Sequence, residues 1–168
     1  MTDRRTLLKA ALLAAAGAAA PGLEAHAAAG AMPLDQHGYK PANALAGTIP
    51  WQMLGTTESY EKVINGFTWV LPKFPPKVRE LNGKVIRVNG YMMPLDTTEK
   101  QSRFLLMAYP QTCPYCLSVG SQFFIEVLAS TPVTYSQDAM VIEGRMELLE
   151  QDENGLYYRM RAARQLKG

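Results

Sequence analysis

The residues best suited to chemistry are Cys113 and Cys116, the only cysteines of the chain, in the sequence Thr112-Cys113-Pro114-Tyr115-Cys116. Two thiols separated by two residues can meet in one tight turn, where they form a disulfide or bind one metal ion together. The sequence leaves three uses open: a redox-active disulfide, a metal site and a structural disulfide. The structural disulfide is the weakest of the three, because closing so short a loop contributes little stability.

The redox interpretation starts from the motif C-P-Y-C, which glutaredoxin-like oxidoreductases use for thiol–disulfide exchange. A strand precedes it, and a thiolate at the start of a helix has a lowered pKa. After Cys116, however, the chain predicts a short break and a strand instead of the long helix of that fold. Thr131-Pro132 also follows too soon to serve as its cis-proline. Redox activity would therefore require a scaffold other than thioredoxin.

The metal interpretation rests on two thiolates, which are half of a tetrahedral Zn(II) site or a complete linear Cu(I) site. Met92, Met93 and Met107 precede the motif on predicted strands and can add thioethers for copper, although methionines also fill gaps in apolar cores. Histidine is scarce, because the only two are His26 and His37, both in the first 37 residues. Hydrolases of the Ser-His-Asp and Cys-His types are therefore excluded.

Residues 1–27 predict a twin-arginine signal peptide, with Arg4-Arg5 before the apolar run Ala10–Ala20 and small residues at Ala25 and Ala27. An ordinary secretory signal is the alternative, and both place the protein in the periplasm. The apolar run is shorter than the roughly 20 residues of a spanning helix, so it does not predict an uncleaved membrane anchor. No other segment approaches that length, and we therefore expect no membrane span in the mature chain. The net charge of +2 and the interspersed charges argue against a nucleic-acid partner.

Residues 28–50 are rich in Ala, Gly and Pro and predict a flexible leader, with order beginning near Trp51. Residues 51–168 predict a single all-β domain with a small α content, a five- to six-stranded OB-like β-barrel, with a β-sandwich as the alternative. A short helix is expected over 57–64, and Gly90 is expected to mark a bend or bulge. The predicted strands are 67–71, 84–93, 103–109, 123–128, 140–149 and 156–164.

Several short stretches together resemble a known group of proteins. They are Trp51-x-x-Leu54, Leu81-Asn82-Gly83-Lys84-Val85, Gly90-Tyr91-Met92-Met93-Pro94-Leu95, Phe104-Leu105-Leu106 and the cysteine turn. The chain resembles, from about Trp51 to its C-terminus, an uncharacterised family of exported bacterial proteins, a domain of unknown function found in periplasmic proteins and lipoproteins.

The resemblance implies an OB-like periplasmic domain that serves as a binding or accessory protein, since some relatives accompany ABC-type export systems tied to metal homeostasis. Many relatives follow the first cysteine with a histidine and a proline-rich turn before an Asn-Gln. Here Pro114-Tyr115-Cys116 stands instead, and Gln122 takes the position of that glutamine. If the relatives bind metal through Cys and His, Cys116 would replace the histidine.

These observations predict a periplasmic binding or accessory protein centred on Cys113 and Cys116. The pair would bind a soft metal ion, Cu(I) or Zn(II), or act with a partner protein of an envelope transport system. The enzyme alternative is a thiol–disulfide redox protein on a non-thioredoxin scaffold. The third alternative is a structural subunit of an envelope complex in which the disulfide is inert.

Overall fold

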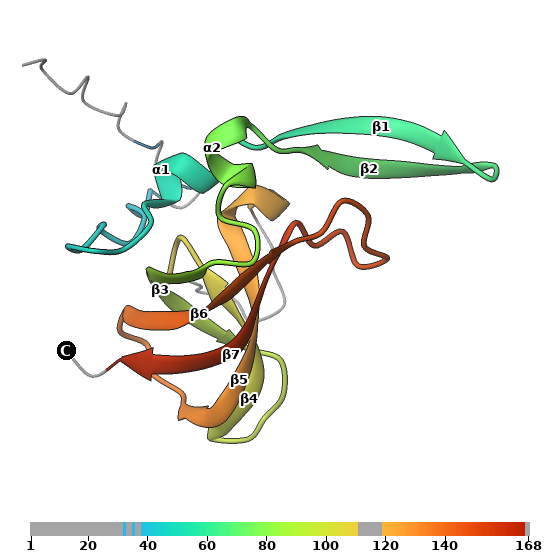
Figure 1. The fold of residues 1–168 in the computed structure, drawn as a ribbon. Coiled ribbons are helices and arrows are strands. Elements are labelled where there is room, and N and C mark those ends of the chain that lie inside the picture. Colours follow the sequence, from blue (N-terminus) through green and yellow to red (C-terminus); the bar gives the residue numbers. More distant parts are fainter. Residues whose placement is uncertain (1–31, 33–34, 36–37, 111–118, 167–168) are drawn as a thin grey trace, which may run out of the picture.

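The computed structural model describes residues 32, 35, 38–110 and 119–166 (Figure 1). The predicted signal peptide and both cysteines lie outside these residues. The elements, in chain order, are α1 (Trp51–Leu54), β1 (Glu58–Ile64), β2 (Phe67–Lys73), α2 (Pro76–Arg79), β3 (Val85–Pro94), β4 (Lys100–Met107), the 3-10 turn η1 (Ser121–Phe123), β5 (Phe124–Thr134), β6 (Met140–Leu148) and β7 (Tyr158–Leu166). No helix in this part of the chain is long and apolar enough to cross a membrane.

Five strands form a closed barrel in the order β3-β4-β5-β7-β6, which confirms the predicted barrel over the β-sandwich. All neighbours are antiparallel except β5 and β7, which are parallel. Strand β3 pairs with β6 as far as Gly90 and with β4 from Tyr91 onward. A Cβ at Gly90 would lie 2.8 Å from the carbonyl oxygen of Met107, so the strand can change partners there only with a glycine.

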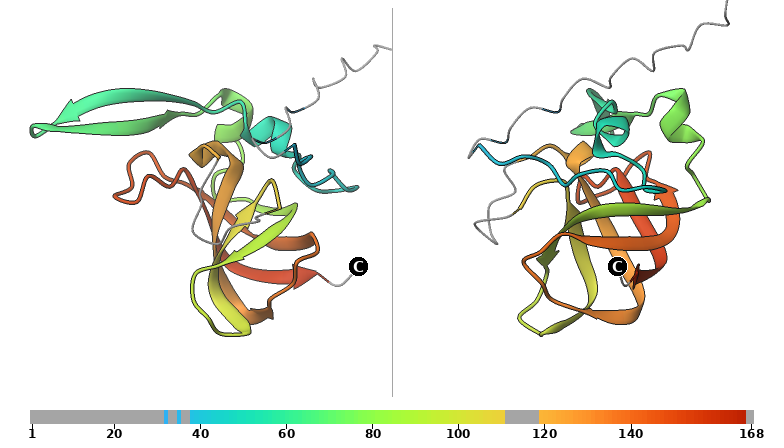
Figure 2. Two further views of the ribbon diagram at one scale, coloured as in Figure 1. Left: turned by 180° about the vertical axis from the view of Figure 1, so that it is seen from behind. Right: turned by 90° about the vertical axis from the view of Figure 1, so that its left-hand side faces the viewer.

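The helix predicted over 57–64 is wrong, because residues 58–64 form strand β1. It pairs with β2 across the turn Asn65-Gly66, whose φ angles of 52° and 83° are those of a type I′ hairpin. Thr57 and Glu58 resemble the start of a helix, but the Asn65-Gly66 turn and the apolar residues on either side of it favour a hairpin, and the hairpin forms. The hairpin stands away from the barrel in two views (Figures 1 and 2).

The barrel interior is filled by fully buried side chains, among them Val88, Phe104, Ile125 and Ile142. Helix α1 lies against one end of the barrel, where two hydrogen bonds hold it and a third holds Thr57 just after it. The Trp51 indole donates to the Asn89 carbonyl oxygen at 2.7 Å. The Tyr158 hydroxyl lies 2.8 Å from the Leu54 carbonyl oxygen and 2.6 Å from the Thr57 hydroxyl.

Part of the predicted leader contacts the barrel. Ala42 is only 6% exposed, and its N–H donates to the Ala108 carbonyl oxygen at 2.7 Å. The Ile49 N–H donates to the Arg87 carbonyl oxygen at 2.7 Å. The segment before Trp51 thus touches the barrel at Ala42 and Ile49, whereas residues 43–47 between them are exposed.

Strand β7 contains a bulge, because Ala162 and Ala163 lie where β6 supplies only Gly144. Ala162 has a φ of 48°, a left-handed conformation that L-residues seldom adopt. A Cβ at Gly144 would come within 2.5 Å of the Met160 side chain. The bulge and the glycine together let β6 and β7 curve tightly around the barrel.

Candidate site around the cysteine segment

The chain that carries the cysteines leaves the barrel at the end of β4 and returns at η1. The two ends are joined at the barrel, since the Ala108 N–H donates to the Phe123 carbonyl oxygen at 2.9 Å. The rings of Tyr109 and Phe123 also pack edge to face, with centroids 5.8 Å apart. The segment between them, including Cys113 and Cys116, is thus anchored on rigid strands at both ends.

The three candidate methionines divide between two clusters. Met92 belongs to the barrel interior, whereas Met93 and Met107 belong to a second apolar cluster on the outside of β3, β4 and β5. We call this set the outer cluster; its buried members are Met93, Leu105, Met107, Phe124 and Leu156. Period-two alternation places adjacent residues 92 and 93 on opposite faces, so only Met93 and Met107 share a side.

Val119, the first described residue after the cysteines, packs against the outer cluster and also against the interior core. Val119, three residues after Cys116, thus lies against the cluster that contains Met93 and Met107. Met93 is 6% exposed and Met107 is fully buried, so their thioethers lie beneath the surface.

Glu126 is a buried carboxylate next to the outer cluster that the sequence analysis missed. It is paired with Leu105 across β4 and β5 and is 2% exposed. Arg103 Nη2 lies 2.7 Å from its Oε1, and Arg159 Nε donates to its Oε2. The only sequence signal is one acidic residue inside the apolar strand F-I-E-V-L. Because two guanidinium groups occupy the carboxylate, Glu126 is not free to bind a metal.

A second acidic residue, Glu143, lies between two arginines on the outside of the barrel. Arg87 Nε donates to it at 2.7 Å, and Arg164 Nε donates to it at 3.0 Å. These hydrogen bonds hold the pKa of the Glu143 carboxyl below its ordinary value, and the bond from Arg87 has the largest effect. Arg164 of β7 thus forms an ion pair on the solvent-exposed outside of the barrel.

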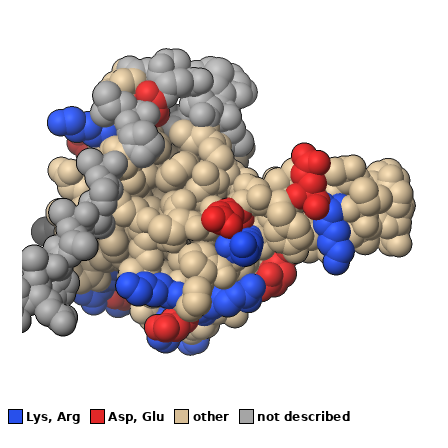
Figure 3. Space-filling view, turned by 90° about the horizontal axis from the view of Figure 1, so that it is seen from above, with Lys and Arg blue, Asp and Glu red and all other residues tan. Residues whose placement is uncertain are grey.

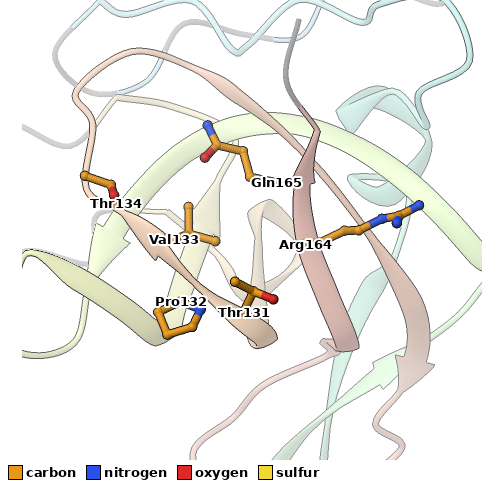
Figure 4. A pocket seen from close by; sticks show the side chains of 6 residues that line it. All are labelled: Thr131, Pro132, Val133, Thr134, Arg164 and Gln165. Atoms are coloured by element: carbon orange, nitrogen blue, oxygen red, sulfur yellow. The ribbon is translucent and has the colours of Figure 1, made fainter.

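A surface hollow of about 310 Å³ lies beside the end of β5, lined by Thr131, Pro132, Val133, Thr134, Arg164 and Gln165 (Figure 4). The Arg164 side chain points away from the other lining residues and toward its partner Glu143. The hollow therefore presents hydroxyl and amide groups without a nucleophile or an acid–base pair. Within the described ranges, no three His, Cys, Asp or Glu side chains are grouped as metal ligands.

The family model described as "Protein of unknown function (DUF3299)" matches residues 58–165. The chain belongs to the DUF3299 family. This confirms the resemblance drawn from the sequence motifs. The match begins at the first residue of β1 and ends in β7, so it spans the projecting hairpin, the barrel and the cysteine segment.

Among solved structures, the chain is similar to a DUF3299 family protein from Pseudomonas aeruginosa PAO1, known from a crystal structure at 2.45 Å resolution. The two are 20% identical, the match covers 58% of this chain and 68% of that chain, and the TM-score is 0.46. A search of curated proteins found no match.

Proposed function

We propose that this DUF3299 protein is a periplasmic binding or accessory protein whose Cys113 and Cys116 bind a soft metal ion, with Cu(I) preferred over Zn(II). The observation that supports it most is the packing of Val119 against the outer cluster. Val119 follows Cys116 by three residues, and the cluster contains Met93 and Met107. Thiolate and thioether sulfur are the ligands that Cu(I) prefers.

The surroundings of these methionines favour copper for a second reason. Two thiolates alone satisfy linear Cu(I), whereas Zn(II) needs four ligands and usually takes nitrogen or oxygen for those that cysteine does not supply. The carboxylate beside the outer cluster, Glu126, is bound by Arg103 and Arg159. An apolar cluster that offers thioethers, with the neighbouring Glu126 carboxylate held in ion pairs, suits a soft monovalent ion.

The experiment is to export the protein through its own signal, purify the mature chain, and measure its metal content and its Cu(I) affinity against a competing chelator. Cys113→Ser should abolish stoichiometric binding. Met93→Leu and Met107→Leu should each weaken Cu(I) binding about tenfold and leave Zn(II) binding unchanged. Met92→Leu is the matched control, because Met92 lies on the same strand but inside the barrel.

Two results would overturn the proposal. A metal-free protein with a disulfide far more oxidising than structural bridges would identify a redox protein on a non-thioredoxin scaffold. A metal-free protein with a strongly reducing, unreactive disulfide would identify a structural subunit of an envelope complex.

A further inference from the structure

The hairpin of β1 and β2, residues 58–73, is an arm that extends from the barrel, and no third strand of the described residues pairs with it (Figures 1 and 2). A two-stranded hairpin is only marginally stable by itself in water, because it has no layer against which to bury a face. Its length and regular register, with seven residue pairs from Glu58–Lys73 to Ile64–Phe67, therefore point to a binding role.

Both faces of the arm expose apolar side chains. Phe67, which is 73% exposed, shares one face with Ile64, Trp69 and Tyr60. Val63 lies on the opposite face and is 68% exposed, as does Val70, which is 53% exposed. A protein partner that covered one face would leave the other in water, so the ligand that fits this arm surrounds it.

Charge is distributed unevenly along the arm. Its charged residues are Glu58, Glu61, Lys62 and Lys73, which sum to zero, and none of them lies closer to the turn than the Lys62–Trp69 pair. From Val63 to Pro72 no residue is charged, and Figure 3 shows the far end of the arm without blue or red atoms. The arm therefore has an uncharged end, and its charges lie between the barrel and the Lys62–Trp69 pair.

We propose that the far end of the arm inserts into the surface of a lipid bilayer, to the level where headgroups meet acyl chains. Lys62 and Trp69 face each other across the two strands. From this pair to the Asn65-Gly66 turn the arm extends about 10 Å, at roughly 3.3 Å per residue. Amphipathic segments that lie in a membrane surface bury a similar depth, about 5–10 Å.

The composition at each level of the arm fits this depth. Ile64 and Phe67 at the end would contact acyl chains. Trp69 would lie at the headgroup level, where tryptophan is enriched, and Lys62 beside it can extend its ammonium into water. The unpaired backbone groups at the edges of β1 and β2 stay within reach of interfacial water, so this shallow insertion needs no closed sheet.

The test is flotation of the mature exported protein with vesicles of phosphatidylcholine and with vesicles of phosphatidylethanolamine and phosphatidylglycerol. Binding should be equal for both, and equal at about 0.1 M and about 0.5 M salt, because the arm has no net charge. Phe67→Ser and Val63→Thr should each lower the partition coefficient, by about tenfold for Phe67→Ser and less for Val63→Thr. Val85→Thr is the matched control, since Val85 is 61% exposed on a barrel strand.

Fluorescence supplies a second readout, because the chain has only two tryptophans and Trp51 is buried at 2% exposure. Brominated lipids should quench Trp69, and Phe67→Ser should relieve the quenching. A protein that stays in the vesicle-free fraction would overturn the proposal. So would binding that disappears at the higher salt, or a dimer in solution that Phe67→Ser dissociates, since the arm would then dock on protein.

Discussion

Tyr158→Phe removes one hydroxyl from the junction between helix α1, the base of the arm and the barrel. That hydroxyl contacts the Leu54 carbonyl oxygen at 2.8 Å and the Thr57 hydroxyl at 2.6 Å. Tyr158 and Leu54 are fully buried and Thr57 is 3% exposed, so water cannot replace the lost partner. The substitution keeps the ring that packs against Phe74.

The expected cost follows from what each group keeps. The Leu54 carbonyl oxygen still accepts the Thr57 N–H at 3.1 Å, so it loses only one of two bonds. The Thr57 hydroxyl loses its partner in a dry environment. With about 0.5–1 kcal/mol for the first and about 1–1.5 kcal/mol for the second, Tyr158→Phe should lower the free energy of unfolding by about 2 kcal/mol. For a domain of this size that corresponds to about 8 °C in Tm.

Urea unfolding at neutral pH measures the effect. Tyr157→Phe is the control, because Tyr157 is also buried, at 3% exposure, and no hydrogen bond of its hydroxyl is found within the described part of the chain. The double variant Tyr158→Phe/Thr57→Val should cost less than the sum of the single variants, since it leaves no unpaired hydroxyl. A loss below about 0.5 kcal/mol for Tyr158→Phe, or additivity in the double variant, would refute the reasoning.

The same pair has a pH signature. Burial raises the pKa of the Tyr158 hydroxyl above its ordinary value of 10.0. Above that pH the unfolded chain releases this proton while the folded protein keeps it, so the stability of the wild type falls as the pH rises. Tyr158→Phe lacks this contribution, and the stability difference between the two proteins should narrow above pH 10.

Three further substitutions test other parts of the barrel. Glu143→Gln should destabilise the protein at pH 7, because hydrogen bonds from Arg87 and Arg164 lower the Glu143 pKa in the folded state. The destabilisation should shrink as the pH falls below the ordinary value of 4.5 and through the lowered one, as urea unfolding at a series of acid pH values would show. Gly90→Ala should cost about 2–3 kcal/mol in thermal unfolding, since its Cβ would meet backbone 2.8 Å away, and an unchanged Tm would contradict the proposed strand crossover. Ala162→Gly should raise the free energy of unfolding by about 0.5–1 kcal/mol, because the left-handed φ of 48° no longer strains a side chain; a loss of stability would mean that the bulge is held by other contacts.

The barrel strands were predictable because local patterns determine them. Alternating apolar residues and the turns between them give each strand its position, and adjacent residues such as Met92 and Met93 must then face opposite sides. Of the arm, strand β2 was predicted as residues 67–71, whereas β1 was wrongly predicted as a helix with Thr56 or Thr57 as its N-cap. The decisive contact is that of Thr57. Its hydroxyl instead binds Tyr158, a partner 101 residues away that no local pattern reveals.

The site was predictable only in part, for the same physical reason. The outer cluster depends on Leu156 and Val119 folding over strands β3, β4 and β5 from distant parts of the chain. Glu126 is held by Arg103 and Arg159, which are 23 and 33 residues away. Such contacts depend on how neighbouring strands are aligned, and the periodicity of the sequence does not determine that alignment. The roles of Cys113 and Cys116, which lie outside the described residues, stay predictions.

The hydrogen bond between Ala108 and Phe123 brings the ends of β4 and β5 together, so the barrel closes without the cysteine segment. Strands β4 and β5 are neighbouring antiparallel strands, which a connection of two to five residues could join. Residues 109–122 are therefore more chain than this connection requires. Tyr109 is buried in the barrel core and Val119 packs against both apolar clusters, so only residues 110–118 can be replaced by a short turn without removing these contacts. Such a variant would lack both cysteines and keep the arm, so it would serve as the negative control for the metal-binding assays and should still bind vesicles.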